Sequence, residues 1–200
     1  TPYNEAYLST PSYAGDFYGA VKATSFAPFT GAHNALMTPS SCDAGDIVVD
    51  VEVISRGGVS DTLTKVALND TSNQKGVVGV FVEELNKDDE FPSSISVITP
   101  NSTDDVLQGN TITILPEYKN VYDAHDLISI NSLGEGQVNV CGEGGNLEIG
   151  DLIVTSSIQG KGKKQGDDII RSTTVAKVRE NVTFSTYSEV KQVACIYLCG

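Results

Sequence analysis

The sequence predicts an all-β fold, a barrel or sandwich of short strands. Two observations predict it: short runs rich in β-branched residues, and clusters of Gly, Asn, Asp and Pro that separate them. The sequence contains no long stripe of apolar residues at helical spacing. With 200 residues, 40% of them hydrophobic and 20% charged, the chain is large enough to bury its own core. Closing into a barrel or packing as a sandwich would pair or protect the sheet edges.

The clearest predicted strand is Ile47–Ile54, with the sequence Ile-Val-Val-Asp-Val-Glu-Val-Ile. The Arg-Gly-Gly at residues 56–58 has the composition of a turn that ends it. Eight later runs share this composition and are also predicted strands: Gly76–Glu83, Ser94–Thr99, Thr111–Leu115, Asp126–Ile130, Gln137–Cys141, Asp151–Ser156, Thr173–Val178 and Val190–Leu198.

The chain divides into an opening arm, residues 1–25, and an all-β domain, residues 26–200. The arm mixes Pro and Gly with aromatic residues and shows no period. We expect its rings to pack on a neighbouring domain or subunit, because large aromatic side chains favour burial; the alternative is a plain linker. The rings are those of Tyr3, Tyr7, Tyr13, Phe17 and Tyr18.

A short internal echo links two parts of the domain. Residues 44–49, Ala-Gly-Asp-Ile-Val-Val, resemble residues 149–154, Ile-Gly-Asp-Leu-Ile-Val. Both read as a Gly-Asp turn that leads into a strand. The echo indicates a repeated design, or merely that Gly-Asp is a favourable turn.

The charge of the chain excludes several classes of partner. The formal net charge is -13 and the pI is near 4.4. Nucleic acids and anionic membranes attract concentrated Lys and Arg, so neither is an expected partner. No apolar run reaches the roughly 18 residues that a membrane-spanning helix needs, so membrane insertion is not expected.

His33 has side chains in its sequence neighbourhood that could form a nucleophile, base and carboxylate set: Ser25, Thr30 and Asp43. No Gly-x-Ser-x-Gly elbow accompanies them, so a structural histidine is the favoured interpretation. His125, between Asp123 and Asp126, is likewise predicted to lie in a solvated turn rather than in a metal site.

Acidic pairs occur in three loop-like segments: Asp88-Asp89, Asp104-Asp105 and Asp167-Asp168. None has the spacing of a calcium loop, so solvated loops are predicted. The Gly- and Lys-rich residues 160–166 lack the following helix of a phosphate-binding loop and are predicted to be a flexible loop. No metal or cofactor is predicted, and the catalytic residues, if the chain has any, stay unknown.

The four cysteines are Cys42, Cys141, Cys195 and Cys199, with no Cys-x-x-Cys pair. This is a poor zinc pattern, and we expect buried free thiols. On one strand Cys195 and Cys199 would lie about 13 Å apart, too far for a disulfide bond. Three Asn-x-Ser/Thr sequons begin at Asn69, Asn101 and Asn181, and matter only in a eukaryotic secretory pathway.

Several segments resemble fibre-type proteins of tailed phages and large algal viruses. The similar segments are Phe29–His33, Ile130–Gly136, Val138–Cys141, Gly145–Ile153, Gly160–Asp168, Thr173–Val178 and Ala194–Gly200. They follow in the same order across residues 26–200 and are most similar after Ile130. Leu198 stands where the family more often has His, and Asn34 where it often has Arg or Cys. These departures argue against a metal or catalytic role there.

The resemblance implies a virion component that is located on the virion, outside the cell. It also implies that the chain forms a homotrimer and contacts other virion proteins. It also implies attachment to a host-surface receptor or glycan, for which the turn-rich residues 91–105 are the expected surface. Related appendage domains carry an autocleaving intramolecular chaperone at the C-terminal end. Single-turnover self-cleavage is therefore one alternative function, and capsid decoration is another.

Overall fold

The computed structural model describes residues 7–8, 15–16, 31–58, 61–88, 90–100 and 110–199. The fold is all-β, which confirms the predicted fold class. Of the predicted arm, the structure describes a short antiparallel pair, β1 (Tyr7–Leu8) with β2 (Gly15–Asp16). The other expectations for the arm, including its aromatic contacts, fall on residues outside those that the structure describes.

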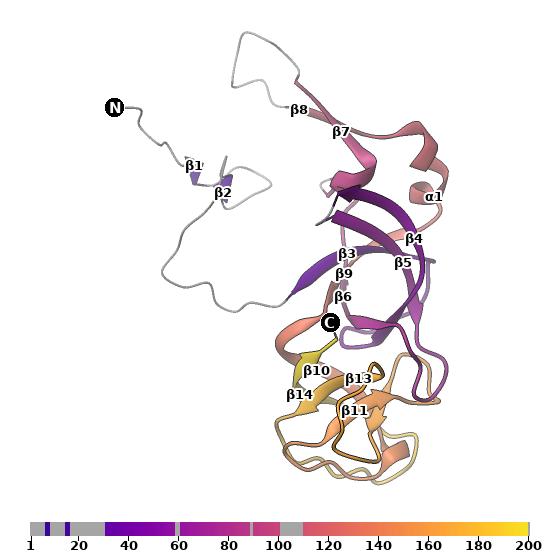
Figure 1. The fold of residues 1–200 in the computed structure, drawn as a ribbon, viewed down its shortest axis with the longest axis vertical. Coiled ribbons are helices and arrows are strands. Elements are labelled where there is room, and N and C mark those ends of the chain that lie inside the picture. The colour runs from indigo at the N-terminus through magenta and orange to yellow at the C-terminus, as the bar shows by residue number, and fades with distance from the viewer. Residues whose placement is uncertain are drawn as a thin grey trace.

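Two closed five-stranded barrels make up the body (Figure 1). Barrel 1 consists of β3 (Ala32–Met37), β4 (Ile47–Gly58), β5 (Asp61–Leu68), β6 (Val77–Glu84) and β9 (Asp126–Asn131). Barrel 2 consists of β10 (Leu133–Cys141), β11 (Leu152–Thr155), β12 (Gly162–Lys164), β13 (Thr174–Val178) and β14 (Val190–Leu198), with a 3₁₀ turn η3 (Gly142–Gly144) after β10.

The two barrels have the same topology. Barrel 1 has the order β3-β5-β4-β6-β9, and barrel 2 has the order β10-β12-β11-β13-β14. In each barrel the first strand pairs with the third in parallel, and every other pairing is antiparallel. The Gly-Asp echo precedes the second strand of each barrel, so it marks a structural repeat.

A smaller subdomain is inserted between β6 and β9. It contains the 3₁₀ turn η1 (Ser93–Ile95), the ribbon of β7 (Ser96–Pro100) and β8 (Asn110–Ile114), the 3₁₀ turn η2 (Pro116–Tyr118) and helix α1 (Lys119–Asp123). It lies at the end of barrel 1 that is farther from barrel 2 (Figure 1). Within the described residues, no helix has the length and apolar character needed to cross a membrane.

Each predicted strand overlaps an observed one, with two corrections. The run predicted from Ser94 begins with η1, and the strand starts at Ser96. The Arg-Gly-Gly predicted as a turn belongs to β4, which bends through register shifts and continues to Gly58. Strands β3, β5 and β12 were not predicted, because polar residues and lysines interrupt their apolar positions.

Three apolar clusters follow from this arrangement. One fills barrel 1: Ala35, Met37, Val48, Val66, Phe81, Ile128 and Ile130. A second packs the subdomain against the barrel: Leu36, Leu63, Ile95, Tyr122 and Leu127. The third fills barrel 2 and also includes Ile47 and Val80 of barrel 1, so the barrels share one core.

The waist between the barrels also holds both ends of the body. The Gly31 amide donates to the Leu133 carbonyl at 3.0 Å, and the Ser132 amide donates to the Gly31 carbonyl at 3.0 Å. Leu133 pairs with Leu198 at the end of β14. The start of β3 and the C-terminal end therefore lie side by side at the waist (Figure 1).

Candidate functional site

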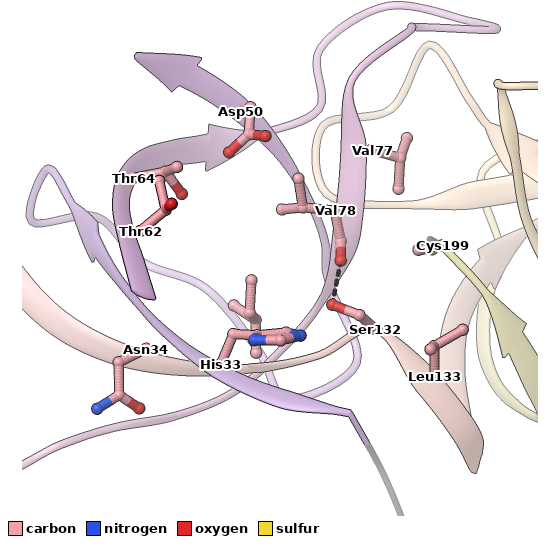
Figure 2. Close-up of a pocket in the computed structure, with 11 residues that line it drawn as sticks. His33, Asn34, Asp50, Thr62, Thr64, Val77, Val78, Ser132, Leu133 and Cys199 are labelled. Atoms are coloured by element: carbon pink, nitrogen blue, oxygen red, sulfur yellow. Dashed lines mark hydrogen bonds between the residues drawn. The ribbon is translucent and has the colours of Figure 1, made fainter. Parts of the chain in front are cut away.

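A pocket of about 330 Å³ opens in barrel 1 beside the waist (Figure 2). One wall is polar and is formed by β3, β4 and β5, and the other is mainly apolar and includes the end of barrel 2. The polar lining residues are His33, Asn34, Asp50, Thr62, Thr64 and Ser132, and the others are Val77, Val78, Ile130, Leu133 and Cys199. The polar wall offers hydrogen bonds to a small polar ligand, and the mainly apolar wall would contact the rest of that ligand.

The pocket places His33 near Ser132 without forming a catalytic pair. Ser132 directs its hydroxyl to the carbonyl oxygen of Val78 rather than to the imidazole (Figure 2). A nucleophilic serine needs its hydroxyl on the base. Cys199 donates its Sγ–H to the Val175 carbonyl at 3.1 Å, and burial raises the pKa of this thiol to about 12, so it stays protonated near neutral pH.

Of the residues grouped with His33 from the sequence, Asp43 is the one that the structure describes, and it is not brought to His33. Asp43 lies at the junction between the barrels, where its Oδ2 is 3.6 Å from Lys161 Nζ. Ser25 and Thr30 lie outside the described residues. Within the described part of the chain, no residue of the set proposed from the sequence lies beside His33, so the catalytic interpretation gains no support.

His125 is held in a turn, as the sequence predicts. Its Nδ1 is 2.7 Å from the Val121 carbonyl oxygen, and its own carbonyl accepts a hydrogen bond from Lys87 Nζ. Asp123 pairs instead with Lys119 at 2.8 Å. Among the described residues, no group of three or more His, Cys, Asp and Glu side chains could hold a metal ion.

The Gly- and Lys-rich residues 160–166 are not the flexible loop that was predicted. They contain strand β12, and its lysines are held by carboxylates: Lys163 lies 2.7 Å from Glu143 and Lys164 lies 2.6 Å from Asp151. Burial alone would raise the pKa of Glu143, but hydrogen bonds from Lys163 and Ser157 outweigh it and lower the pKa to about 2. Ion pairs on neighbouring turns order this segment.

Of the three acidic pairs, the structure describes Asp167-Asp168 in full. Asp167 accepts hydrogen bonds from Arg171, from the Ile169 amide at 3.0 Å and from Gln165 at 2.9 Å. The Arg171 hydrogen bond is the main reason that the pKa of Asp167 falls to about 2. Residues 89, 104 and 105 lie outside the described residues.

The cysteines and sequons can be placed in part. All four cysteines are free thiols; Cys141, Cys195 and Cys199 are buried, as predicted, whereas Cys42 is half-buried. Asn69 is fully buried between the barrels, so folding closes its sequon to a glycan. Asn181 is exposed, and Asn101 lies outside the described residues.

Sequence reasoning missed a buried polar cluster at the junction of the barrels. We call it the junction cluster, and its side chains come from both barrels or from the turns between their strands. Its members are Asp46, Asn69, Asn139, Thr155, Ser156 and Lys161.

The centre of the junction cluster is the Asp46 carboxylate, which is 3% exposed as a residue. Its Oδ1 accepts hydrogen bonds from Lys161 Nζ and from Asn139 Nδ2, the latter at 2.7 Å. Its Oδ2 accepts the Asp43 amide at 3.2 Å. A buried carboxylate with a cation and several donors is well satisfied.

Two further members extend the cluster. Asn69 Nδ2 lies 3.3 Å from the carbonyl oxygens of both Ser156 and Lys161. Thr155 Oγ1 donates to the Thr71 carbonyl at 2.9 Å and accepts the Gln74 amide at 2.7 Å. The network joins the barrels by directional contacts around their shared apolar core.

The chain matches no protein-family model, and no curated protein matches it either.

Proposed function

We propose that this chain is a structural module of a virion appendage, such as a fibre, that serves assembly and host attachment. One observation carries the proposal: two barrels of one topology are fused by a shared apolar core and a buried polar junction. A body joined in this way resists bending between its parts, because both kinds of contact would have to break. Stiffness of this kind suits a part that transmits force.

Five of the seven segments that resemble fibre-type proteins support the proposal because they lie in barrel 2. Of the other two, one includes His33 in β3 of barrel 1, and Ile130–Gly136 spans the end of β9 and the start of β10. Residues 138–141 lie in β10, residues 145–153 form the Gly-Asp turn and enter β11, and residues 160–168 contain β12. Residues 173–178 and 194–200 overlap β13 and β14. These five motifs thus correspond to connected parts of one barrel.

The ribbon of β7 and β8 is the surface that we assign to attachment. It lies at the end of the body away from barrel 2 (Figure 1). Its Ile98 side chain is 61% exposed. Val97 is also exposed, and Thr99 and Thr111 add hydroxyl groups nearby. Exposed apolar and hydroxyl side chains on a projecting ribbon suit contact with a host-surface protein or glycan.

Assembly as a homotrimer is part of the same proposal. Barrel 2 exposes Leu133, Val190 and Ile196 on the neighbouring strands β10 and β14, and packing against identical subunits would cover such side chains. Light scattering of the purified chain should give the mass of three copies. A stable monomer at micromolar concentration would contradict this part of the proposal.

The virion role is tested on particles purified from the source of the sequence. Peptides of this chain should band with intact particles in a density gradient, and antibodies against barrel 2 should label an appendage. Peptides found solely in fractions without particles would reject the role, while labelling of the particle shell would favour capsid decoration.

A further inference from the structure

Three side chains of the junction cluster, those of Asp46, Asn139 and Lys161, meet at one carboxylate oxygen. Lys161 Nζ and Asn139 Nδ2 both donate hydrogen bonds to the same oxygen, Oδ1 of Asp46. The set thus contains an amine, a carboxamide and a carboxylate that contacts both. An amine can displace ammonia from a carboxamide when a carboxyl group moves the protons.

The strand pairing explains why the amine and the amide lie together. Strands β10 and β12 run parallel, with Val140 opposite Gly162. Asn139 comes directly before Val140 in β10, and Lys161 comes directly before Gly162, the first residue of β12. The backbones of Asn139 and Lys161 are therefore neighbours. Since both side chains reach Asp46, they lie on the same side of this pair. Holding two reactants in this way replaces a chance encounter with a fixed one.

The carboxylate is fixed from the other barrel. Asp46 precedes β4 of barrel 1, and a Cβ added to Gly160 would lie 2.8 Å from its Oδ2. The backbones also interlock, because the Ile47 amide donates to the Gly160 carbonyl at 2.7 Å and the Asn139 amide donates to the Gly45 carbonyl at 2.9 Å. Asp46 therefore has little room to move away from the pair.

The surroundings of the set are dry enough for such chemistry. The Asp46 side chain is 4% exposed and the Lys161 side chain is 14% exposed. Fully buried apolar residues of the shared core adjoin them along the chain: Ile47 beside Asp46, and Val138 and Val140 on either side of Asn139. Exclusion of water limits competing hydrolysis of the amide and favours proton transfer between neighbouring groups.

We propose that Lys161 and Asn139 join through an intramolecular amide bond, with Asp46 as the catalytic residue. Asp46 takes a proton from the Lys161 ammonium, and the neutral Nζ attacks Cγ of Asn139. Asp46 then returns a proton to Nδ2, the Cγ–Nδ2 bond breaks, and ammonia leaves. Nζ loses its second proton as the amide forms, and this proton converts the ammonia to ammonium, which carries away the charge of Lys161. The reaction therefore needs no oxidant or cofactor.

The bond would close the weakest seam of barrel 2. Strand β10 pairs with β14 along its whole length, from Leu133 to Cys141, whereas it pairs with β12 at Val140 and Gly162. A covalent link between residues 139 and 161 staples this short seam. Because the catalyst belongs to barrel 1, the link forms after the barrels have docked, and it fixes barrel 2 in its assembled shape.

The intact mass of the purified, denatured chain tests the proposal. We expect a mass lower than that of the sequence by one molecule of ammonia, and a branched proteolytic peptide that joins the segments around Asn139 and Lys161. The full mass in protein shown by circular dichroism to be folded would overturn the proposal. Loss of one water instead would place the bond on Asp46 and would overturn Asn139 as the acceptor.

Two lysine variants provide the matched control. Lys161→Arg keeps a positive charge at the junction but removes the amine, so it should show the full mass. Lys163→Arg alters the lysine two residues later, which pairs with Glu143 outside the set, and should still lose ammonia. Ammonia loss that persists in Lys161→Arg would mean that the reaction lies elsewhere and would also overturn the proposal.

Discussion

The two Gly-Asp turns of the molecule share a local geometry but contact different partners. Gly45 and Gly150 have φ angles of 94° and 100°, a region that favours glycine. In each turn the following Asp donates its amide to the carbonyl of the residue three positions earlier, and its carboxylate accepts the amide of that residue. The sequence echo therefore encodes one turn, built twice.

The difference lies in the lysine that each Asp meets. Asp151 pairs with Lys164 of its own barrel, at 2.6 Å, and is 15% exposed at the side chain. Lys164 is the partner of Ile153 in the sheet, and the equivalent position in barrel 1, opposite Val48, is Leu68. Asp46 has no lysine there and pairs with Lys161 of barrel 2 instead. One changed position thus turns a local contact into a joint between barrels.

Removing the carboxylate of Asp46 or of Asp151 should give the largest difference between the joint between the barrels and the contact within barrel 2. Asp46→Ala leaves a largely buried Lys161 without its main partner and should lower the free energy of unfolding by about 3–5 kcal/mol. Asp151→Ala removes a more exposed pair and should cost about 1 kcal/mol. Urea denaturation of both variants measures the difference, and equal losses would show that the junction adds nothing beyond the turn.

Adding a methyl group to each turn glycine isolates the packing between the barrels. Both Gly45→Ala and Gly150→Ala incur the backbone strain of a positive φ, about 1–2 kcal/mol. A Cβ at Gly45 would also lie 3.2 Å from Asn139 Oδ1, whereas the nearest atom to one at Gly150 is 3.9 Å away. Gly45→Ala should therefore be less stable by roughly 1 kcal/mol more in the same urea assay. A larger loss for Gly150→Ala would contradict this packing.

Glu143 extends the comparison to a second carboxylate that holds a β12 lysine within barrel 2. Its pKa is lowered from the usual 4.5 to about 2, so its ion pair contributes stability above pH 4.5. That contribution is lost as the pH falls through about 2. As the pH is lowered from 4.5 to about 2, the free energy of unfolding of the wild type should fall more steeply than that of Glu143→Gln. Parallel curves would show that Glu143 does not stabilise the folded state through its charge.

Thiol labelling compares the barrels without altering them. Cys42 of barrel 1 is half-buried, whereas Cys195 and Cys199 of barrel 2 are buried, and burial raises the pKa of each of the two to about 12. An alkylating reagent should modify Cys42 first in the folded protein, and the barrel 2 thiols after unfolding. Mass spectrometry of timed samples counts the labels, and early labelling of Cys195 would show that barrel 2 opens readily.

The sequence predicts well those elements whose signal is local. Strand β14 has the predicted bounds, Val190–Leu198, because buried and exposed positions alternate along it. Strand β12 was missed because its Gly-Lys-Lys sequence has no apolar signal and is ordered by Glu143 and Asp151. β3 was missed for a related reason, since its first half is exposed and polar.

The junction cluster shows why the candidate site was harder to predict. Asp46 was predicted as part of a turn, and that part is confirmed. Its partners Asn139 and Lys161 are 93 and 115 residues away in the chain. No local spacing connects them, and they meet because two barrels of equal topology share a core. The repeated Gly-Asp was the available signal. It indicates where each turn lies, but it does not indicate which lysine pairs with the Asp of that turn.

Gly31 is hydrogen-bonded to Leu133, which in turn pairs with Leu198, and this arrangement has a mechanical consequence. A force applied between the start of β3 and the end of β14 acts across a few hydrogen bonds at the waist, and not along either barrel. The parts of both barrels that lie away from the waist are then not stretched by this force. Neighbouring ends also suit circular permutation, in which a short linker joins them and new termini open in an exposed loop.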